Sequence, residues 1–398
     1  MPLEPAQRDW LTLALVPGVG TANFIRLLAR FRTPRRVLTA SAGELQDVVS
    51  KNLAQRIKQY GDVVNVEEQE RRMDEYGVRF ITLDDPDYPV RLAEIYDPPL
   101  ALFVRGDLFQ ADEHCVAIVG TRHPTPYGIR MAEQFGRELA GRGITVVSGM
   151  AQGIDAAAHR GALEAGGRTI AVLGCGVDVV FPAQHAELMH QIIQQGCVIS
   201  EFEMGIKALG GNFPQRNRII SGMTMGTLIV EAPPHSGALI TAKQAAEQGR
   251  EVFAIPGQIG IRNSLGPHAL IREGAKLVET AEDILVELKV PAEMRVAPAP
   301  QPAPEPIIPA PAPKPATTAV PKAASPPRPA EKPKTAPPAA VLTPVEKDVL
   351  SALAPEGSFV DEIAQACRIS VSEALSSLTM LELKGLARQF SGKRFAPR

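Results

Sequence analysis

The stretch VAIVGTRHPTPYG, residues 116–128, decides the fold class of this 398-residue chain. Its four apolar residues before Gly120 predict a strand that is buried on both faces, and the polar, turn-forming residues after Gly120 lead into a helical segment. Strands without polar alternation are typical of parallel sheets that helices cover on both sides. The stretch therefore predicts one strand-loop-helix unit of an α/β sheet.

The same alternation of apolar runs and helical segments extends over residues 78–290. We predict an α/β fold with a Rossmann-like, mostly parallel, doubly wound sheet. Ligands bind such sheets outside the carboxyl ends of the strands, where the loops here are rich in glycine and small polar residues that suit phosphate. The predicted strands are 78–83, 100–104, 116–120, 144–149, 169–174, 197–202, 227–232, 251–257 and 276–280.

Several classes of protein are disfavoured by what these loops and the composition lack. No loop has the G-K-[ST] of a P-loop, and GCGVDVVF (174–181) has only the first half of a dinucleotide fingerprint. The four cysteines form no C-x-x-C pair, which argues against zinc and disulfides and fits a reducing compartment. No apolar run approaches the ~20 residues of a membrane helix, and no signal pattern opens the chain. We expect a cytoplasmic protein with no membrane contact, metal or cofactor.

Composition divides the chain into four parts. Residues 1–64 form a helical domain, and residues 65–290 form the sheet domain. Residues 291–341 contain 17 of the 36 prolines and read as a Pro/Ala-rich linker. Residues 342–398 predict three helices and a hairpin, the order of a winged helix, with capping boxes at Thr343/Glu346 and Ser370/Glu373. Seven basic and seven acidic residues in this last part favour contact with protein over contact with DNA.

A glycine-turned helical hairpin is predicted at LTLALVPGVGTANFIRLLARF, residues 11–31. It resembles the helix-hairpin-helix motif, in which backbone N–H groups at the start of a helix hold a phosphate without reading a base. Gly18 and Gly20 are therefore candidate phosphate contacts. A hairpin that only packs explains these residues equally well, so both interpretations stay open.

Charge limits how the sheet domain can bind a polyanion. Residues 65–290 carry twenty Lys/Arg and twenty-nine Asp/Glu. The overall field is therefore unfavourable, and any nucleic-acid site in this domain must be a local cluster of basic groups.

A set of long motifs in fixed order resembles the DNA-processing protein A (DprA/Smf) family. The resemblance covers roughly residues 80–290, and the flanking modules are similar to that family's arrangement. It implies a Rossmann-like core that binds and protects single-stranded DNA, forms a homodimer, and helps load the recombinase RecA in natural transformation, competence and homologous recombination. The motifs are VAIVGTRHPTPYG, VVSGMAQGIDAAAH, TIAVLGCGVDVVFP, ISEFEMG, FPQRNRIISG, VEAPPHSGALITA, REVFAIPG and LIREGAKLV.

Under this resemblance FPQRNRIISG (213–222) supplies the DNA contacts. Phe213 stacks on a base, and Arg122 converges on it from a neighbouring loop. Arg216 and Arg218 provide planar donors for phosphate. Because they are two apart on a helix, they point to different sides, and an ion pair with Glu201, Glu203 or Glu231 remains open for either. The other expected DNA contacts are Gly120, Thr121, Ser148, Gly149 and Asn217.

Two further segments carry weaker expectations. Lys207 is a candidate phosphate contact, but the stretch LGGNF before the helix departs from the family, which often has a basic residue there. SLGPHALIREGAKLV (264–278) resembles the family's dimerising segment. The expected interface residues are Leu265, His268, Ile271 and Arg272. Leu265 and Ile271 are explained equally well as ordinary core.

The competing function is a nucleotide-processing enzyme on the same type of sheet. MTMGTLIVEA (223–232) resembles the P-G-G-x-G-T-x-x-E stretch of phosphoribohydrolases, with Glu231 in a comparable place but without the leading glycine pair. We favour binding without catalysis, because polar residues in helix turns are more often caps or partners. The residues that would form an acid-base site are Asp155, His159, Asp178 and His185.

Overall fold

The protein is described by a computed structural model that covers residues 3–291, 343–354, 357–384, 386–390 and 394–397. These residues form two compact units, one within residues 1–306 and the other within residues 307–398, and each is described on its own. The predicted linker lies, apart from its first residue, outside the described residues. None of the described helices is long and apolar enough to span a lipid bilayer.

Short, well-capped helices fill residues 5–76. The rings of Trp10 and Phe24 meet with their centroids 4.7 Å apart and form the centre of a core that continues into the sheet. Gly18 has a φ of +96° in the turn between the first two helices, and Gly20 is the N-cap of the second. The predicted glycine-turned hairpin is therefore confirmed. The helices are α1 (Pro5–Ala14), α2 (Thr21–Phe31), α3 (Pro34–Thr39), α4 (Ala42–Gln46), α5 (Lys51–Lys58), α6 (Tyr60–Val63) and α7 (Val66–Tyr76).

The central element is one sheet with the strand order β1-β2-β6-β5-β4-β3-β7-β8-β9. Neighbours from β6 to β9 in this order are parallel, whereas β2 is antiparallel to both β1 and β6. All nine predicted strands are present, and several end earlier than predicted; β3 and β4, for example, end directly before Gly120 and Gly149. The strands are β1 (Val78–Thr82), β2 (Ala101–Gly106), β3 (Cys115–Val119), β4 (Thr145–Ser148), β5 (Thr169–Val172), β6 (Cys197–Ser200), β7 (Gly226–Ile229), β8 (Glu251–Ala254) and β9 (Lys276–Leu277).

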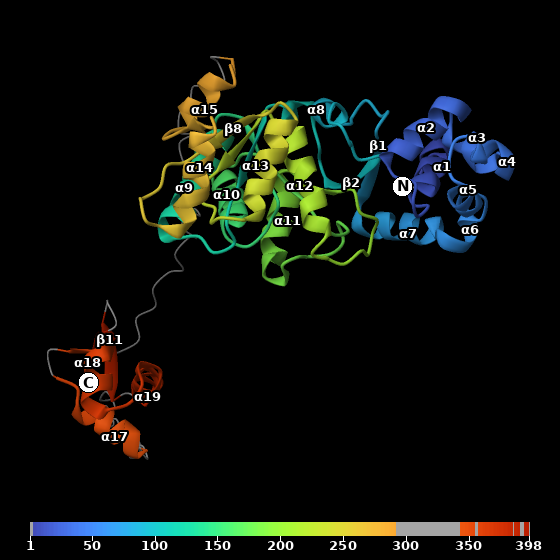
Figure 1. The fold of residues 1–398 in the computed structure, drawn as a ribbon. Coiled ribbons are helices and arrows are strands. Elements are labelled where there is room, and N and C mark those ends of the chain that lie inside the picture. Colours follow the sequence, from blue (N-terminus) through green and yellow to red (C-terminus); the bar gives the residue numbers. More distant parts are fainter. Residues whose placement is uncertain (1–2, 292–342, 355–356, 385, 391–393, 398) are drawn as a thin grey trace, which may run out of the picture. The chain divides into compact units, whose positions relative to one another are not determined.

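Helices cover both faces of the sheet, as the unbroken apolar strands predict. In β3, Val116 and Ile118 pack against one layer, whereas Ala117 and Val119 pack against the other. The first layer contains α9 (Pro126–Ala140), α10 (Ile154–Glu164), α11 (Ala186–Gln195) and α15 (Ala281–Glu287). The second contains α8 (Val90–Ala93), α12 (Asn212–Met223) and α13 (Gly237–Glu247), and Figure 1 shows α12 beside α13. A further helix, α14 (Leu265–Arg272), contacts β8.

The second unit has the predicted winged-helix order. Both capping boxes are present, at Thr343/Glu346 and Ser370/Glu373, and Lys384 forms an ion pair with Glu346 at 2.6 Å. A short strand, β10, joins the predicted hairpin in a sheet of order β10-β12-β11. The fold class is therefore confirmed. The elements are α17 (Pro344–Ser351), β10 (Ser358–Phe359), α18 (Val360–Cys367), α19 (Val371–Leu383), β11 (Ala387–Phe390) and β12 (Arg394–Pro397).

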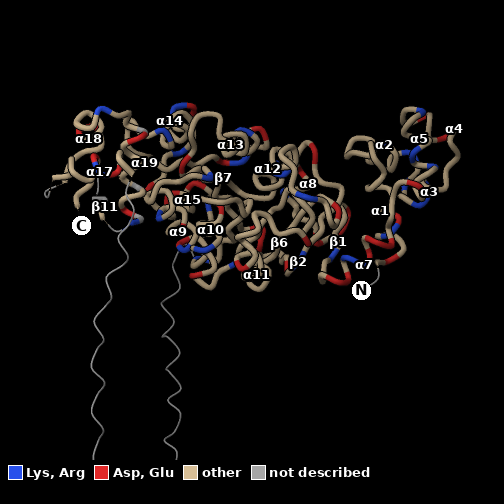
Figure 2. The backbone as a smooth tube through the Cα atoms, turned by 90° about the horizontal axis from the view of Figure 1, so that it is seen from below, with Lys and Arg blue, Asp and Glu red and all other residues tan. Residues whose placement is uncertain are grey.

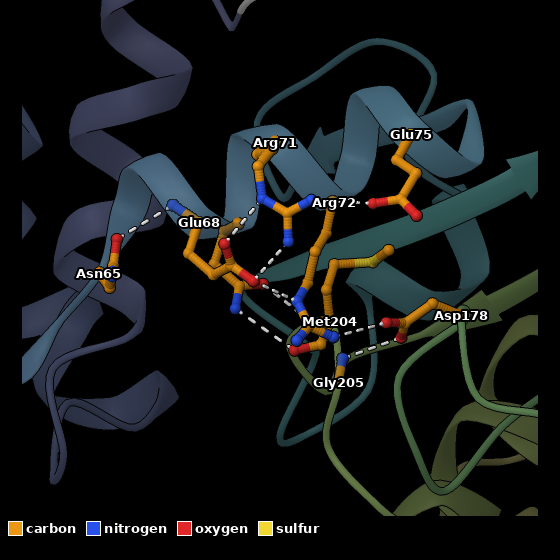
Figure 3. A network of polar contacts seen from close by, with 9 residues as sticks. Asn65, Glu68, Arg71, Arg72, Glu75, Asp178, Met204 and Gly205 are labelled. Carbon is orange, nitrogen blue, oxygen red and sulfur yellow. Dashed lines mark hydrogen bonds and ion pairs between the residues drawn. The ribbon is translucent and has the colours of Figure 1, made fainter.

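Helix α7 connects the N-terminal helices to the loops that follow β5 and β6 (Figure 3). Arg72 Nη1 lies 3.1 Å from Asp178 Oδ2, and the other oxygen of Asp178 accepts a 2.8 Å hydrogen bond from the Gly205 N–H. On the same helix, hydrogen bonds from Arg71 and Arg72 lower the pKa of Glu68 to about 2. These contacts fix the course of both loops relative to α7.

The buried side chain of Gln69 makes a second connection from α7. Its amide nitrogen donates to the Met204 carbonyl at 3.3 Å, and its amide oxygen accepts from the Met204 N–H at 2.8 Å. One side chain thereby satisfies both polar groups of a buried backbone unit, which water cannot reach.

Replacing this side chain tests how strongly the connection stabilises the fold. We expect Gln69→Leu to lower the free energy of unfolding by about 1 to 3 kcal/mol, because it leaves the Met204 N–H buried without a partner. Urea unfolding of the full chain measures the change. Gln55→Leu, on the exposed face of α5, is the matched control and should stay within about 0.5 kcal/mol of the parent. Equal unfolding midpoints for the two variants would contradict this role.

Candidate nucleic-acid interface

The loops that follow β3, β4, β5 and β6 meet around one aromatic ring at the carboxyl edge of the sheet, the edge where its parallel strands end. Phe213 lies in the first turn of α12, and Asn212 Nδ2 anchors that turn by donating to the Gly174 carbonyl at 3.0 Å. The ring centroid of Phe181 is 5.6 Å from that of Phe213. The ring of Phe213 therefore has a fixed position beside a second aromatic ring.

Arg122 brings a positive charge to this ring from the loop after β3. Its guanidinium carbon lies 5.2 Å from the centroid of Phe213, within the range of cation-π attraction. The side chain is exposed and forms no ion pair with any described residue. The predicted convergence of Arg122 and Phe213 is thus present in the structure, with the donors of Arg122 still available to a ligand.

Arg216 lies below this surface instead of on it. Only 3% of the residue is exposed, and its Nη1 would lie 1.5 Å from a Cβ atom on Gly149, so only glycine fits at that position. Asp155 accepts hydrogen bonds from the Gly149 and Ala151 N–H groups and faces Arg216. Arg216 therefore places a buried charge under the loop after β4.

Burial and mutual attraction act in opposite directions on this pair. Burial lowers the pKa of Arg216, while the charge of Asp155 raises it. Burial raises the pKa of Asp155, while the charge of Arg216 and the backbone N–H groups lower it. Burial is the larger effect for both groups, so the pKa of Asp155 is raised and that of Arg216 is lowered. The sequence analysis did not place Asp155 in this site. Its position in the first turn of α10, directly after the loop that follows β4, could have indicated it.

Arg218 forms the ion pair that sequence analysis left open. Its Nη1 and Nη2 each lie 2.7 Å from a carboxylate oxygen of Glu201, and its Nε lies 3.3 Å from Asp97. The side chain is only 13% exposed. The planar donors expected to hold phosphate are therefore occupied by two carboxylates, one of which, Asp97, the sequence did not indicate.

The remaining residues expected to contact DNA differ in how far they are exposed to solvent. Asn217 donates to the Gly237 carbonyl and lines a cavity of about 480 Å³ together with Gly120, Thr121, Arg122 and Phe213. Ser148 is fully buried, and its hydroxyl donates to the Ile118 carbonyl at 2.6 Å. This bond engages the hydroxyl between β4 and β3, and Ser148 is not among the residues that line the cavities around Arg122 and Phe213. Its neighbour Gly149 remains at the wall of a smaller cavity behind Phe213.

Three expected phosphate contacts lie apart from this cluster. Gly18 and Gly20 are in the N-terminal hairpin, where Arg56 donates to the Pro17 carbonyl. Lys207 is exposed in the loop after β6. None of these three residues lines the cavities around Arg122 and Phe213.

Each residue of the alternative acid-base site has a partner of its own, although Asp155 and His159 share α10 and the charge of His185 acts on His159. His159 is fully buried beside the Thr169 hydroxyl at 2.6 Å, and burial lowers its pKa to about 3. His185 Nδ1 contacts the Met150 carbonyl, and Asp178 pairs with Arg72. Among the described residues, no group of three or more His, Cys, Asp or Glu is placed to hold a metal ion.

Glu231 has a structural role at the end of β7. One carboxylate oxygen accepts from the Thr125 hydroxyl at 2.5 Å, and the other accepts from the Thr125 N–H at 2.8 Å. Asn263 Nδ2 donates to the second oxygen at 3.2 Å. The carboxylate thus fastens Thr125, the N-cap of α9 at the end of the loop that carries Arg122, to the segment after β7.

Comparisons with known proteins agree with this architecture. A family model described as DNA recombination-mediator protein A matches residues 79–289, and one described as the DprA winged helix domain matches residues 332–393. Protein Smf of Synechocystis sp. is 35% identical over 405 residues, which cover 98% of this chain and 99% of its own. The X-ray structure of DNA processing protein A from Streptococcus pneumoniae is 34% identical with a TM-score of 0.63, covering 72% of this chain and 99% of that one.

Arg218 is paired with carboxylates and Arg122 is exposed, so we expect their replacement to affect the free energy of unfolding differently. We expect Arg218→Ala to lower the free energy of unfolding by about 3 kcal/mol, because it leaves the half-buried Glu201 carboxylate unpaired. Arg122→Ala is the control and should unfold at the parent's midpoint, since its side chain has no carboxylate partner among the described residues. Denaturant titration followed by circular dichroism measures both. An unchanged midpoint for Arg218→Ala would show that the ion pair is not a structural requirement.

Proposed function

We propose, because this chain belongs to the DNA recombination-mediator protein A (DprA/Smf) family, that it binds single-stranded DNA, protects it and delivers it to the recombinase RecA during natural transformation. The main observation that supports this binding site is the contact between Arg122 and Phe213. An exposed guanidinium that has no carboxylate partner among the described residues and lies 5.2 Å from an aromatic ring offers a phosphate donor beside a stacking platform. Single strands are bound by this combination, since every base has a face that can stack.

The charge distribution supports a small number of strong contacts. The sheet domain is net acidic, and acidic and basic positions are interspersed along its backbone (Figure 2). Arg137, Arg168 and Arg218 are all paired with carboxylates, whereas Arg122 has no such partner in the described part of the chain. Affinity for a polyanion therefore rests on a few local donors, with Arg216 contributing a buried positive charge beneath them.

We infer that Arg216 and Arg218 support DNA binding mainly by positioning α12 and the loop after β4, and less by contacting DNA themselves. Arg216 keeps the loop after β4 against α12, and Arg218 fixes α12 against Glu201. Gly120, Thr121, Gly149 and Asn217 then offer backbone or side-chain groups at the rim of the cavities. Lys207, Gly18 and Gly20 stay secondary proposals, as contacts for parts of a strand beyond this cluster.

We also propose that the protein binds without catalysis. The carboxylate that would act in a phosphoribohydrolase-like site is held by Thr125 and Asn263. Each of the four residues of the alternative acid-base set is engaged by a hydrogen bond or an ion pair within the chain. A cytoplasmic location is part of the proposal because RecA acts there, and all four cysteines are free thiols.

A homodimer is proposed through α14 and its surroundings. His268 and Arg272 are tied within the chain, since His268 Nε2 contacts the Gly257 carbonyl and Arg272 Nε donates to the His268 carbonyl. Leu265 is 44% exposed, and Ile259, Ile261 and Leu277 nearby in the chain are exposed as well. Exposed apolar side chains of this size support a self-complementary contact with a second copy.

Single-strand binding is tested by removing the two central side chains separately. We expect Arg122→Ala to lower affinity for an oligothymidylate by about tenfold or more, the effect of one charged hydrogen bond. Phe213→Ala should lower it by about 1 to 3 kcal/mol through lost stacking. For about three neutralised phosphates, log K should fall against log salt with a slope of roughly −2, shallower by ~0.7 in Arg122→Ala and unchanged in Phe213→Ala.

Fluorescence anisotropy titrations at several salt concentrations provide these values. Arg137→Ala is the charge-matched control, because Arg137 is exposed and pairs with Glu164 near the C-terminal ends of α9 and α10, opposite the carboxyl edge. Parent-like affinity and slope in Arg122→Ala would overturn the proposed site.

The dimer is tested with a charge placed in the apolar surface. We expect Leu265→Glu to give a folded monomer at tens of micromolar protein, because a carboxylate cannot be buried there without a partner. Val286→Glu is the control, since Val286 is also exposed, at 52%, but lies on α15. Light scattering distinguishes the states, and a parent protein that is already monomeric would refute the proposed interface.

A further inference from the structure

A groove of about 590 Å³ lies beside the Phe213 cluster on the α10 side. Arg122 stands at the junction, because it lines this groove, the cavity in front of Phe213 and the smaller cavity behind it. The groove is therefore continuous with the proposed DNA site. Its polar lining residues are Arg122, His123, Gln152, Arg160, Gln184 and His185.

The lining of this groove is unusual for an acidic domain. Twelve residues line it, and none is Asp or Glu, whereas the cavity in front of Phe213 includes Asp155. Arg160 extends from α10, is exposed, and has no hydrogen bond or ion pair with the described residues. The side chains of Gln152 and Gln184 are likewise exposed and unpaired within the described part of the chain.

These donors fit a flexible chain better than a small anion. A discrete anion site needs buried, fixed donors, and the one buried polar side chain at the wall, His185, already uses Nδ1 for the Met150 carbonyl at 2.9 Å. Arg160, Gln152 and Gln184 are long, solvated side chains instead. Such side chains suit successive phosphates and base edges of a single strand, which contacts its partner at many weakly held points.

We propose that the groove carries the continuation of the bound single strand past Arg122, with Arg160 as the phosphate contact and Gln152 and Gln184 as additional donors. This rests on the proposed function, since the strand enters from the Phe213 cluster. Arg122 then holds the phosphate at which the strand passes from one cavity to the other. The groove thereby extends the binding site without adding affinity for oligonucleotides too short to reach it.

The length dependence of binding tests this path. Anisotropy titrations use oligothymidylates of about 5 and about 15 nucleotides, near the limits of what single-strand modules span. We expect Arg160→Ala to weaken binding of the longer strand by about threefold to tenfold, to flatten its salt slope by ~0.7, and to leave the shorter strand unaffected. Gln184→Glu, which places a carboxylate in the groove, should also weaken only the longer strand.

The controls separate this proposal from the function on which it rests. Arg122→Ala should weaken both lengths, and Arg137→Ala neither. If Arg122→Ala weakens both lengths while Arg160→Ala and Gln184→Glu bind the longer strand like the parent, the groove does not carry DNA. Equal losses for both lengths in Arg160→Ala would place Arg160 in the primary site and refute the extension. If Arg122→Ala also has no effect, the proposed function itself fails.

Discussion

A charge that is buried at the carboxyl edge of the sheet constrains everything around it. Arg216 is almost inaccessible to water and faces Asp155, whose carboxylate accepts hydrogen bonds from the loop after β4. Removing either charge would leave the other buried without compensation, so helix α12 and this loop must keep their relative positions. The lack of a side chain at Gly149 follows from the same contact, as does the position of Phe213 one turn earlier on α12.

Arginine can stabilise a fold or bind a ligand, and in this structure different arginines do each. Arg216 and Arg218 are enclosed by protein and hold α12 in place, whereas Arg122 and Arg160 are solvated and have no carboxylate partner among the described residues. Because the domain carries more acidic than basic groups, a cation remains available to a ligand only where the fold keeps carboxylates away from it. The loops after β3 and β4 meet that condition, since Glu231 and Asp155 are both engaged by hydrogen bonds from the chain.

The sequence was sufficient for the fold class, because unbroken apolar runs such as VAIV (116–119) and glycine-rich loops report burial and turns locally. The convergence of Arg122 on Phe213 was expected from the resemblance to the DprA/Smf family, since the two follow β3 and β6, which are not neighbours in the sheet. The sequence could not assign the environments of Arg216 and Arg218, because these depend on tertiary packing that brings Asp155 to Arg216 and Glu201 to Arg218. Asp97 is 121 residues from Arg218, and only the tertiary structure brings them together. The strand order, with β2 antiparallel to β6, is likewise a consequence of packing between distant segments.

The contact between Gln69 and Met204 has an implication for how this protein can change over evolutionary time. A side-chain amide that bonds only to backbone groups specifies the path of a loop and is indifferent to the side chains that the loop carries. The path of the loop through Met204 is therefore independent of the side chain at that position, whereas Glu201, which pairs with Arg218, and Gly205, which has a φ of +84°, stay constrained. Helix α7 thus fixes the shape of this loop without fixing the side chain at position 204.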